Sequence, residues 1–277
     1  MPTALAGCSS FSISASVRVS SDVLPGEMLA AAPAGEPLAT VRRIAIVPAF
    51  NEERNIGRLL AELSSLDPEL EVVVVSDGST DRTASVARGA GAHVVELPFN
   101  LGIGGAVQTG FRYAWEGGFE LAVRLDGDGQ HDPGQLRAVV APVVAGEADL
   151  AIGSRFLTAG GYRSSAARRI GIRVLARVVS WIARERLTDT TSGFQALNRR
   201  AIALFAADLP RDYPEVEGLV MAIRHRIRVC EVPVTMRERE HGNSSIGTLG
   251  SMYYMIKVLL AIFVDLFRRD IGPLEET

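Results

Sequence analysis

Two aspartates one residue apart, Asp126 and Asp128, are the residues of this chain whose types and spacing best suit chemistry. They directly follow the apolar run 119–125, which predicts a buried strand. In an extended chain, residues i and i+2 point to the same side, so the two carboxylates can share one divalent cation. Such hard oxygen ligands suit Mg²⁺ or Mn²⁺, which fill their remaining positions with substrate phosphates. The alternative is a plain Asp-Gly turn without a ligand.

The elements that must position these carboxylates follow from alternating apolar runs. The predicted strands are 42–47, 71–75, 93–97, 120–125 and 149–152. The predicted helices are 52–66, 81–90, a glycine-rich opening that continues through 115, 133–144 and 166–184. We expect Asn51 to cap the first helix, with Glu52 and Glu53 in its first turn, and Gly91 to end the second. Strands that alternate with helices predict an α/β fold, a mostly parallel sheet with helices on both faces.

Polar clusters follow four of the predicted strands. They are 48–52, 76–80, 126–128 and 153–155. Ligands of a parallel sheet gather at the carboxyl ends of its strands, so we expect the four clusters to share one rim. Within them, Asp77 can accept hydrogen bonds from a nucleobase or a ribose hydroxyl. Ser79 or Thr80 can instead simply cap the next helix.

The glycine-rich segment 100–110 is similar at first glance to a dinucleotide-binding fingerprint. It fails that pattern because Val107 stands where the third glycine is needed, and because it follows the third predicted strand rather than the first. Its glycines, Gly104 among them, are better explained by a helix start that approaches a ribose or a phosphate closely.

The predicted helix 166–184 separates two kinds of side chain. Arg169, Arg173 and Arg177 recur every four residues and share one face. Another face carries Ile170, Val174, Val178 and Trp181. The helix is either an ordinary amphipathic surface helix or one that meets lipid headgroups or an acceptor phosphate.

Further polar residues occur in the second half of the chain. In the turn 189–194, Asp189 can act as a general base and Ser192 can bind phosphate. Glu217 is a second candidate base, and Arg237 begins a loop able to close over a diphosphate. The histidines lack the spacing of metal ligands, and we interpret them as non-ligands; they are His131, His225 and His241.

Composition and charge limit the remaining possibilities. Residues 1–149 carry a net charge of −9 and residues 150–277 one of +6, which suggests contact of the second half with phosphates or an anionic membrane face. The two cysteines, Cys8 and Cys230, are not expected to form a disulfide. Residues 1–40 are interpreted as a disordered tail. The apolar stretch 252–267 predicts a C-terminal helix, either at the membrane interface or packed on protein.

With these residues placed, the chain resembles the family 2 glycosyltransferases with the GT-A fold, and most of all their dolichol- and polyprenyl-phosphate sugar transferase branch. The resemblance covers about residues 42–246 and rests on the order and spacing of seven segments. They are 48–52, 77–81, 100–106, 126–133, 153–155, 189–194 and 231–234. The chain departs from the pattern at Thr188, where the family often has arginine, and carries two additional acids, Glu215 and Glu217.

The resemblance implies roles for individual residues. Pro48, Ala49, Glu52, Asp77, Gly104 and Asp126 would bind the nucleotide. Asp126, Asp128 and Gln130 would position Mg²⁺ or Mn²⁺ on the diphosphate. Arg155, Ser192 and Arg237 would bind the diphosphate or the acceptor phosphate. A GT-A domain at 41–246 would precede a C-terminal helix at 247–277, possible at the membrane.

The expected function is metal-dependent, inverting transfer of a sugar from a nucleoside diphosphate sugar to a polyprenyl phosphate. With a saccharide hydroxyl as acceptor, Asp189 or Glu217 would serve as base. Nucleotidyl transfer and a non-catalytic sugar-nucleotide binding module are remote alternatives. We expect a cytoplasmic protein, peripheral on the inner face of the cell membrane, with a homodimer or a membrane-protein partner possible and no nucleic acid bound.

Overall fold

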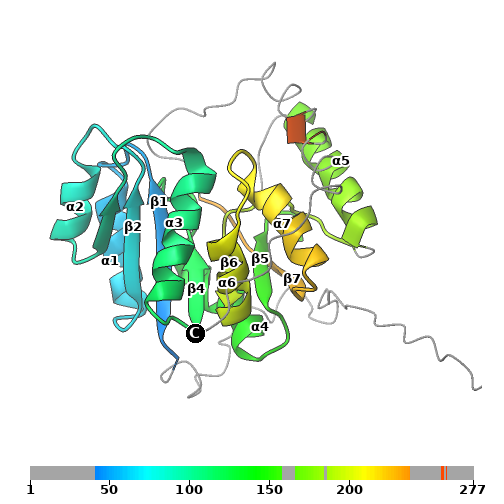
Figure 1. The fold of residues 1–277 in the computed structure, drawn as a ribbon, viewed down its shortest axis with the longest axis horizontal. Coiled ribbons are helices and arrows are strands. Elements are labelled where there is room, and N and C mark those ends of the chain that lie inside the picture. The colour runs from blue at the N-terminus through cyan, green and yellow to red at the C-terminus, as the bar shows by residue number, and fades with distance from the viewer. Residues whose placement is uncertain (1–40, 158–165, 184–185, 238–256, 259, 261–277) are drawn as a thin grey trace, which may run out of the picture.

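The computed structural model describes residues 41–157, 166–183, 186–237, 257, 258 and 260 (Figure 1). The predicted tail 1–40, His241 and nearly all of the predicted helix 247–277 lie outside these residues. Seven strands form one sheet in the order β3-β2-β1-β4-β6-β5-β7. The strands are β1 (Arg43–Ala49), β2 (Glu71–Ser76), β3 (His93–Glu96), β4 (Leu121–Arg124), β5 (Leu150–Ser154), β6 (Gln195–Asn198) and β7 (Val229–Pro233).

The sheet is mostly parallel, as the sequence predicts. Strand β1 pairs in parallel with β2 and β4, while β6 runs antiparallel between β4 and β5. Strand β7 then continues in parallel beside β5. The parallel strands therefore end at one edge, where all four predicted polar clusters begin. Strand β6 is not among the strands that the sequence predicts, and the structure shows its antiparallel direction.

Helices cover both faces of the sheet (Figure 1). They are α1 (Ile56–Leu66), α2 (Thr83–Gly89), α3 (Gly102–Glu116), the 3-10 helix η1 (Pro133–Gln135), α4 (Leu136–Val144), α5 (Ala166–Ala183), α6 (Arg199–Ala207) and α7 (Pro214–Arg224). One core joins the sheet to α3, α5, α6 and α7, and a second joins it to α1, α2 and α4. Burial of apolar side chains on both faces explains why the strands are nearly continuous apolar runs.

The loop before α1 corrects the predicted helix start. Asn51 does not cap the helix, which begins at Ile56, so Glu52 and Glu53 lie outside its first turn. Asn51 has a left-handed backbone (φ 57°), and its side-chain oxygen accepts a hydrogen bond from the Thr80 N–H at 2.8 Å. Two further bonds run from the backbone of this loop to the side chains of Asp81, before α2, and Thr83, its first residue. Long-range bonds between the two loops thus replace the local cap.

Helix α5 buries a different face from the one predicted. Its fully buried side chains are Ile172, Leu175, Ala176 and Val179. On the predicted apolar face, Val174 and Val178 are half-buried and Trp181 is 79% exposed, so that prediction is wrong for the tryptophan. Arg173 and Arg177 are exposed at the predicted four-residue spacing and continue in a line to Trp181.

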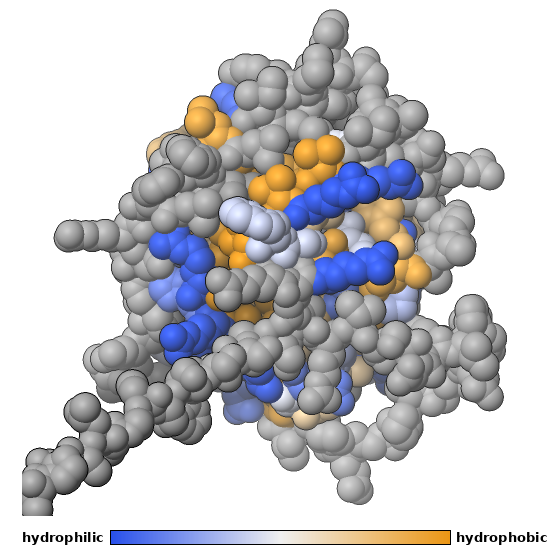
Figure 2. Space-filling model, turned by 90° about the vertical axis from the view of Figure 1, so that its right-hand side faces the viewer, coloured by the Kyte–Doolittle hydropathy of each residue, from blue (hydrophilic) through white to orange (hydrophobic). Residues whose placement is uncertain are grey.

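The surface on the α5 side combines polar and apolar groups. Extended hydrophilic side chains lie across hydrophobic surface at the centre of this side (Figure 2). Val258, from the predicted C-terminal helix, is fully buried in the same core as Leu175 and Val179, so this part of the segment packs on protein. Across the described ranges, the helices all fall short of the length and apolar character needed to cross a bilayer.

An ion-pair network at the opposite edge of the sheet supports a prediction about acid stability. The buried Asp149 accepts hydrogen bonds from the Arg228 side chain at 2.8 and 3.1 Å and from Asn198 at 2.8 Å. Burial raises the pKa of Asp149, but the bonds from Arg228 outweigh it and the net pKa lies below the ordinary value. The stabilisation is therefore present above an unfolded pKa of about 3.9 and is lost as pH falls through the lower folded value.

We expect Asp149→Asn to lower the free energy of unfolding by about 2 kcal/mol at pH 7, the usual worth of hydrogen bonds to a charged group. As pH falls through the lowered folded pKa of Asp149, the difference from the native chain should shrink, because the carboxyl then becomes protonated in both states. Urea denaturation at a series of pH values from 7 downward measures this. A difference that does not change with pH would contradict the assigned role of the charge.

Candidate active site

The loops after β1 and β2 are held against each other at the rim of the sheet. The Asp77 N–H donates to the carbonyl of Ala49 at 2.9 Å, and an Asp77 carboxylate oxygen accepts from the Leu101 N–H at 2.7 Å. Gly78 has φ +65°, and a Cβ there would lie 2.6 Å from the backbone nitrogen of Asn100. Only glycine fits this contact, so the segment fixes Asp77 beside Ala49.

The Asp-x-Asp turn lies directly on the end of β1. The Gly127 N–H donates to the carbonyl of Pro48 at 3.2 Å, and a Cβ on Gly127 would lie 3.2 Å from that of Ala49. Two predicted nucleotide-binding residues, Pro48 and Ala49, are thus adjacent to the predicted metal-binding turn. Glycine allows the close approach because it carries no side chain.

Asp126 occupies a polar but protein-lined position. Its backbone N–H donates to Nδ1 of His131 at 3.0 Å, and its Oδ1 lies 3.5 Å from the Arg124 guanidinium. Its side chain is 35% exposed. Burial raises the pKa of Asp126, but the positive charges around it, Arg124 foremost, outweigh burial and hold the net pKa below the ordinary value. Asp126 is therefore an ionised carboxylate at neutral pH, as a cation ligand must be.

His131 acts in the structure as a support for Asp126. It is buried, with its ring stacked on Phe194 at 5.2 Å between centroids. Burial lowers the pKa of His131, so the imidazole is neutral at pH 7 and Nδ1 is free to accept a hydrogen bond. This bond fixes the backbone at the start of the Asp-x-Asp turn.

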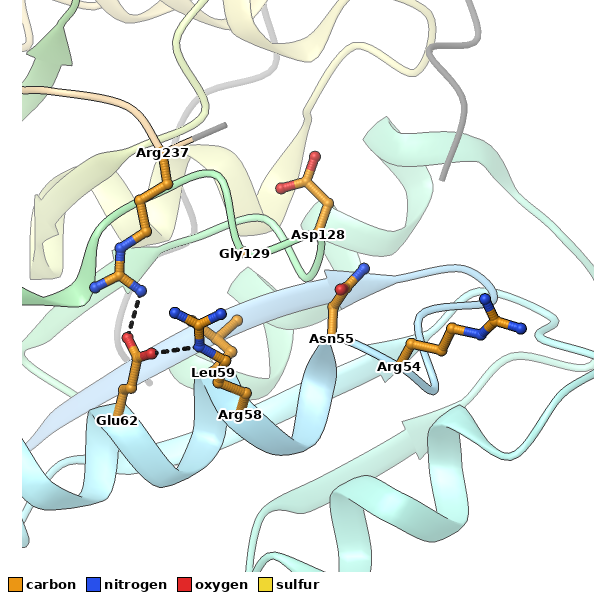
Figure 3. A pocket seen from close by; sticks show the side chains of 8 residues that line it. All are labelled: Arg54, Asn55, Arg58, Leu59, Glu62, Asp128, Gly129 and Arg237. Carbon is orange, nitrogen blue, oxygen red and sulfur yellow. Dashed lines mark hydrogen bonds and ion pairs between the residues drawn. The ribbon is translucent and has the colours of Figure 1, made fainter. Parts of the chain in front are cut away.

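Asp128 lines a pocket at the start of α1 (Figure 3). Its carboxylate accepts the Gln130 N–H at 3.0 Å, and in Figure 3 it points away from Glu62. The pocket is lined by Arg54, Asn55, Arg58, Leu59, Glu62, Asp128, Gly129 and Arg237. Three arginines make the pocket rich in positive charge.

Arg237 is engaged by carboxylates in this structure. Its two terminal nitrogens lie 2.6 Å from Glu62 and 2.6 Å from Asp132, and its backbone N–H donates to the carbonyl of Gln130 at 2.9 Å. Arg237 thus ties α1 to the segment after the Asp-x-Asp turn. The predicted contact with a diphosphate requires these ion pairs to open and stays a prediction.

The residues present fit a hard divalent cation whose other ligands are mostly oxygens of the substrate. Asp126 and Asp128 offer carboxylate oxygens from one turn, and both side chains are partly exposed. Among the described residues, no group of three or more His, Cys, Asp or Glu side chains is placed to hold a metal ion. A cation bound here would have few protein ligands, which suits Mg²⁺ or Mn²⁺ on a diphosphate.

A buried ion pair lies under the other side of the rim. Arg155, after β5, binds Asp189 in bidentate fashion at 2.6 and 2.7 Å, and its backbone N–H donates to the same carboxylate at 3.1 Å. Asp189 has no exposed surface. With both oxygens in these bonds, Asp189 is placed to hold Arg155, and this geometry does not favour the predicted role of a general base.

Glu231 of β7 holds the start of the 189–194 turn through hydrogen bonds. It accepts the backbone N–H groups of Thr188 and Asp189 at 2.7 to 2.9 Å, and the Thr188 hydroxyl at 2.9 Å. Burial raises the pKa of Glu231, opposed by these backbone donors. Thr188, at the position where the resemblance to the family predicts arginine, also bonds to the Ser154 hydroxyl at 2.7 Å. The departure at this position is thus absorbed by a local hydrogen-bond network.

The remaining predicted site residues are buried or packed tightly against other parts of the protein. Ser192 is buried, and its hydroxyl accepts the Phe194 N–H at 3.3 Å. Glu217 is 8% exposed. A Cβ on Gly104 would lie 2.4 Å from the carbonyl oxygen of Arg211, so glycine is required there by this loop. The predicted contact of Gly104 with a nucleotide stays a prediction.

Arg124 escaped the sequence interpretation, and Glu215 was identified there only as an additional acid without an assigned place. Arg124, at the end of the apolar strand β4, contacts Asp126, and Glu215 of α7 lies 2.5 Å from the same guanidinium. The sequence feature that indicates a buried ion pair here is the arginine within an apolar run, since arginine is almost never buried without a partner. The partner itself, 91 residues away, could not be read from that feature.

The order of the sheet, with the Asp-x-Asp turn at the end of β4, defines the GT-A class of fold. The solved structure of glucosyl-3-phosphoglycerate synthase from Mycobacterium tuberculosis, in complex with Mn²⁺ and UDP-glucose, superposes with a TM-score of 0.62 at 21% identity. The match covers 83% of this chain and 80% of that one. The likeness confirms the predicted fold.

Sequence comparison identifies the family. The model of glycosyl transferase family 2 matches residues 44–204, and the chain belongs to this family. A polyprenol monophosphomannose synthase of Mycolicibacterium smegmatis is 32% identical over 81% of this chain and 90% of its own length. An undecaprenyl-phosphate mannosyltransferase of Micrococcus luteus is 32% identical over 75% and 88%. The predicted resemblance to the polyprenyl-phosphate sugar transferase branch is confirmed, and the protein is a glycosyltransferase.

Proposed function

We propose that this glycosyltransferase transfers a sugar, with inversion, from a nucleoside diphosphate sugar to a polyprenyl phosphate. The observation that carries the proposal is the meeting of three segments at one rim. A Cβ on Gly193 would lie 3.0 Å from both carboxylate oxygens of Asp126, so the 189–194 turn touches the Asp-x-Asp turn. The latter in turn lies on Pro48 and Ala49. Relatives named for polyprenyl phosphate acceptors support the choice of acceptor.

The donor would lie along this rim. Pro48, Ala49 and Asp77 would receive the nucleoside, with Glu52 in the loop that closes this end. Asp126, Asp128 and Gln130 would hold Mg²⁺ or Mn²⁺, which supplies positive charge to the leaving diphosphate when bound. Arg155 would add a second positive charge, held in place by Asp189.

The acceptor phosphate carries its own nucleophile. One of its anionic oxygens attacks the anomeric carbon from the face opposite the diphosphate, and the bond from that carbon to the diphosphate oxygen breaks. The nucleoside diphosphate leaves with the electron pair, and a sugar phosphodiester remains on the lipid. No proton has to be removed from the nucleophile, so a carboxylate engaged like Asp189 does not hinder the reaction. Ser192 would act near the acceptor phosphate after a local adjustment of its turn.

The acceptor lipid implies contact with a membrane. Arg173, Arg177 and Trp181 form an exposed line on α5 and combine positive charge with an interfacial aromatic residue. We infer a peripheral enzyme at the cytoplasmic face, where nucleotide sugars are available.

The test is turnover by the purified full chain with Mn²⁺ and a panel of nucleoside diphosphate sugars. Each donor is offered with a short-chain polyprenyl phosphate and, separately, with saccharides. We expect nucleoside diphosphate release that depends on the lipid phosphate, together with a sugar-linked lipid. Turnover with saccharides alone would overturn the proposal, and Glu217 would then be the first base to test, by Glu217→Gln.

A further inference from the structure

The buried guanidinium of Arg124 lies next to Asp126, a carboxylate proposed to hold the metal ion. The Arg124 side chain is 2% exposed. One terminal nitrogen lies 2.5 Å from Oε1 of Glu215 and 3.5 Å from Oδ1 of Asp126. Its Nε has no hydrogen-bond partner among the described residues. A single terminal nitrogen is therefore shared by two carboxylates, and Glu215 holds the shorter bond.

The three charges are confined by packing. Glu215 lies in the first turn of α7, after Pro214, and its side chain is 16% exposed. On the other side, a Cβ on Gly193 would lie 3.2 Å from the terminal nitrogen of Arg124 and 3.0 Å from both oxygens of Asp126. Arg124 cannot move to solvent from this position, so its charge must be met by the carboxylates around it.

The position of Arg124 poses an electrostatic conflict for a metal site. A guanidinium beside a cation ligand competes with the cation for the same oxygens and repels it. Charges interact more strongly in a partly buried site than in water, so the conflict is large here. A second carboxylate at the same nitrogen offsets the charge of Arg124 and competes with Asp126 for it.

We propose that Glu215 is a positioning residue that neutralises Arg124 and thereby leaves Asp126 available to Mg²⁺ or Mn²⁺. The inference rests on the proposed function, since it requires a cation at Asp126. Without the Glu215 charge, Arg124 closes the 3.5 Å contact and pairs fully with Asp126. The expected consequence is weaker cation binding, even in the absence of donor or acceptor.

The test is Mn²⁺ titration of the full-length protein, with free Mn²⁺ measured by electron paramagnetic resonance. Mn²⁺ is used alone and together with GDP or UDP. We expect Glu215→Gln to weaken Mn²⁺ binding about tenfold, whereas Glu215→Asp, which keeps the charge, should remain within about threefold of the native chain. Glu116→Gln, at an exposed acid of α3, controls for the same change in net charge and should leave the affinity unchanged.

A double variant separates charge compensation from loss of a nearby negative charge. Arg124→Gln/Glu215→Gln removes both partners, so the net charge of the site is preserved and Mn²⁺ binding should return to within about threefold of the native value. Melting curves followed by circular dichroism establish that each variant is folded. If the double variant is unfolded, the contrast between Glu215→Gln and Glu215→Asp decides alone.

The outcomes distinguish the inference from the proposed function. Unchanged affinity in Glu215→Gln, or a folded double variant as weak as Glu215→Gln, overturns the role of Glu215 while the metal site stands. A native chain that binds no Mn²⁺ with either nucleotide overturns both. Loss of binding in Asp126→Asn alongside weakened binding in Glu215→Gln supports both.

Discussion

Replacing Asp128 by alanine is expected to lower sugar transfer by about 10³-fold, because a carboxylate that holds positive charge on the leaving diphosphate is lost. Stabilisation of developing charge by a preorganised group is worth several kcal/mol, and each 1.4 kcal/mol is tenfold in rate. Asp128 is partly exposed and accepts the Gln130 N–H within its own turn, so the fold should survive the change. The measurement is initial rate at saturating donor and Mn²⁺.

The matched control is Glu116→Ala, which removes an acid of the same charge from the surface of α3. Its rate should equal that of the native chain. The loss in Asp128→Ala should also appear as a loss of Mn²⁺ dependence, so that residual activity is the same with and without the ion. Activity within tenfold of native, still dependent on Mn²⁺, would be incompatible with Asp128 as a ligand.

Replacing Asp189 by asparagine has the largest expected effect on stability. Asp189 has no exposed surface, and Arg155, 7% exposed, depends on it for three bonds. Loss of the charge leaves a buried guanidinium without its counter-ion, which costs about 3–5 kcal/mol. For a chain of this size the melting temperature should fall by roughly 10 °C. Thermal and urea unfolding measure the change.

Two further measurements separate a holding role from a base. Arg155→Met/Asp189→Leu removes the pair together, so it should recover much of the stability lost in Asp189→Asn but none of the transfer activity, since Arg155 is absent. In Asp189→Asn itself, the residual rate should keep the native pH profile. A profile that loses its ascending limb would show that Asp189 removes a proton, and the holding role would be abandoned.

The apolar periodicity of the chain predicted strands β1 to β5 and helices α1 to α5, because it reports burial within each element, whereas β6, α6, α7 and β7 were not among the predicted elements. Strands β1, β2 and β3 lie within two residues of their predicted bounds, and the residues at their carboxyl ends meet as expected. Helix starts were less predictable. Asn51 has the residue type of a cap, but its side chain serves Thr80 in another loop.

The sequence by itself determined the α/β class, the Asp-x-Asp turn after β4 and the family, since all of these depend on residue types at short, fixed spacings. The tertiary structure alone decided which charges meet. Arg124 and Glu215 are 91 residues apart, Arg155 and Asp189 are 34 apart, and Arg237 reaches Glu62 across 175 positions. A local pattern shows that a charged residue is buried, but its counter-ion is chosen by the packing of distant elements.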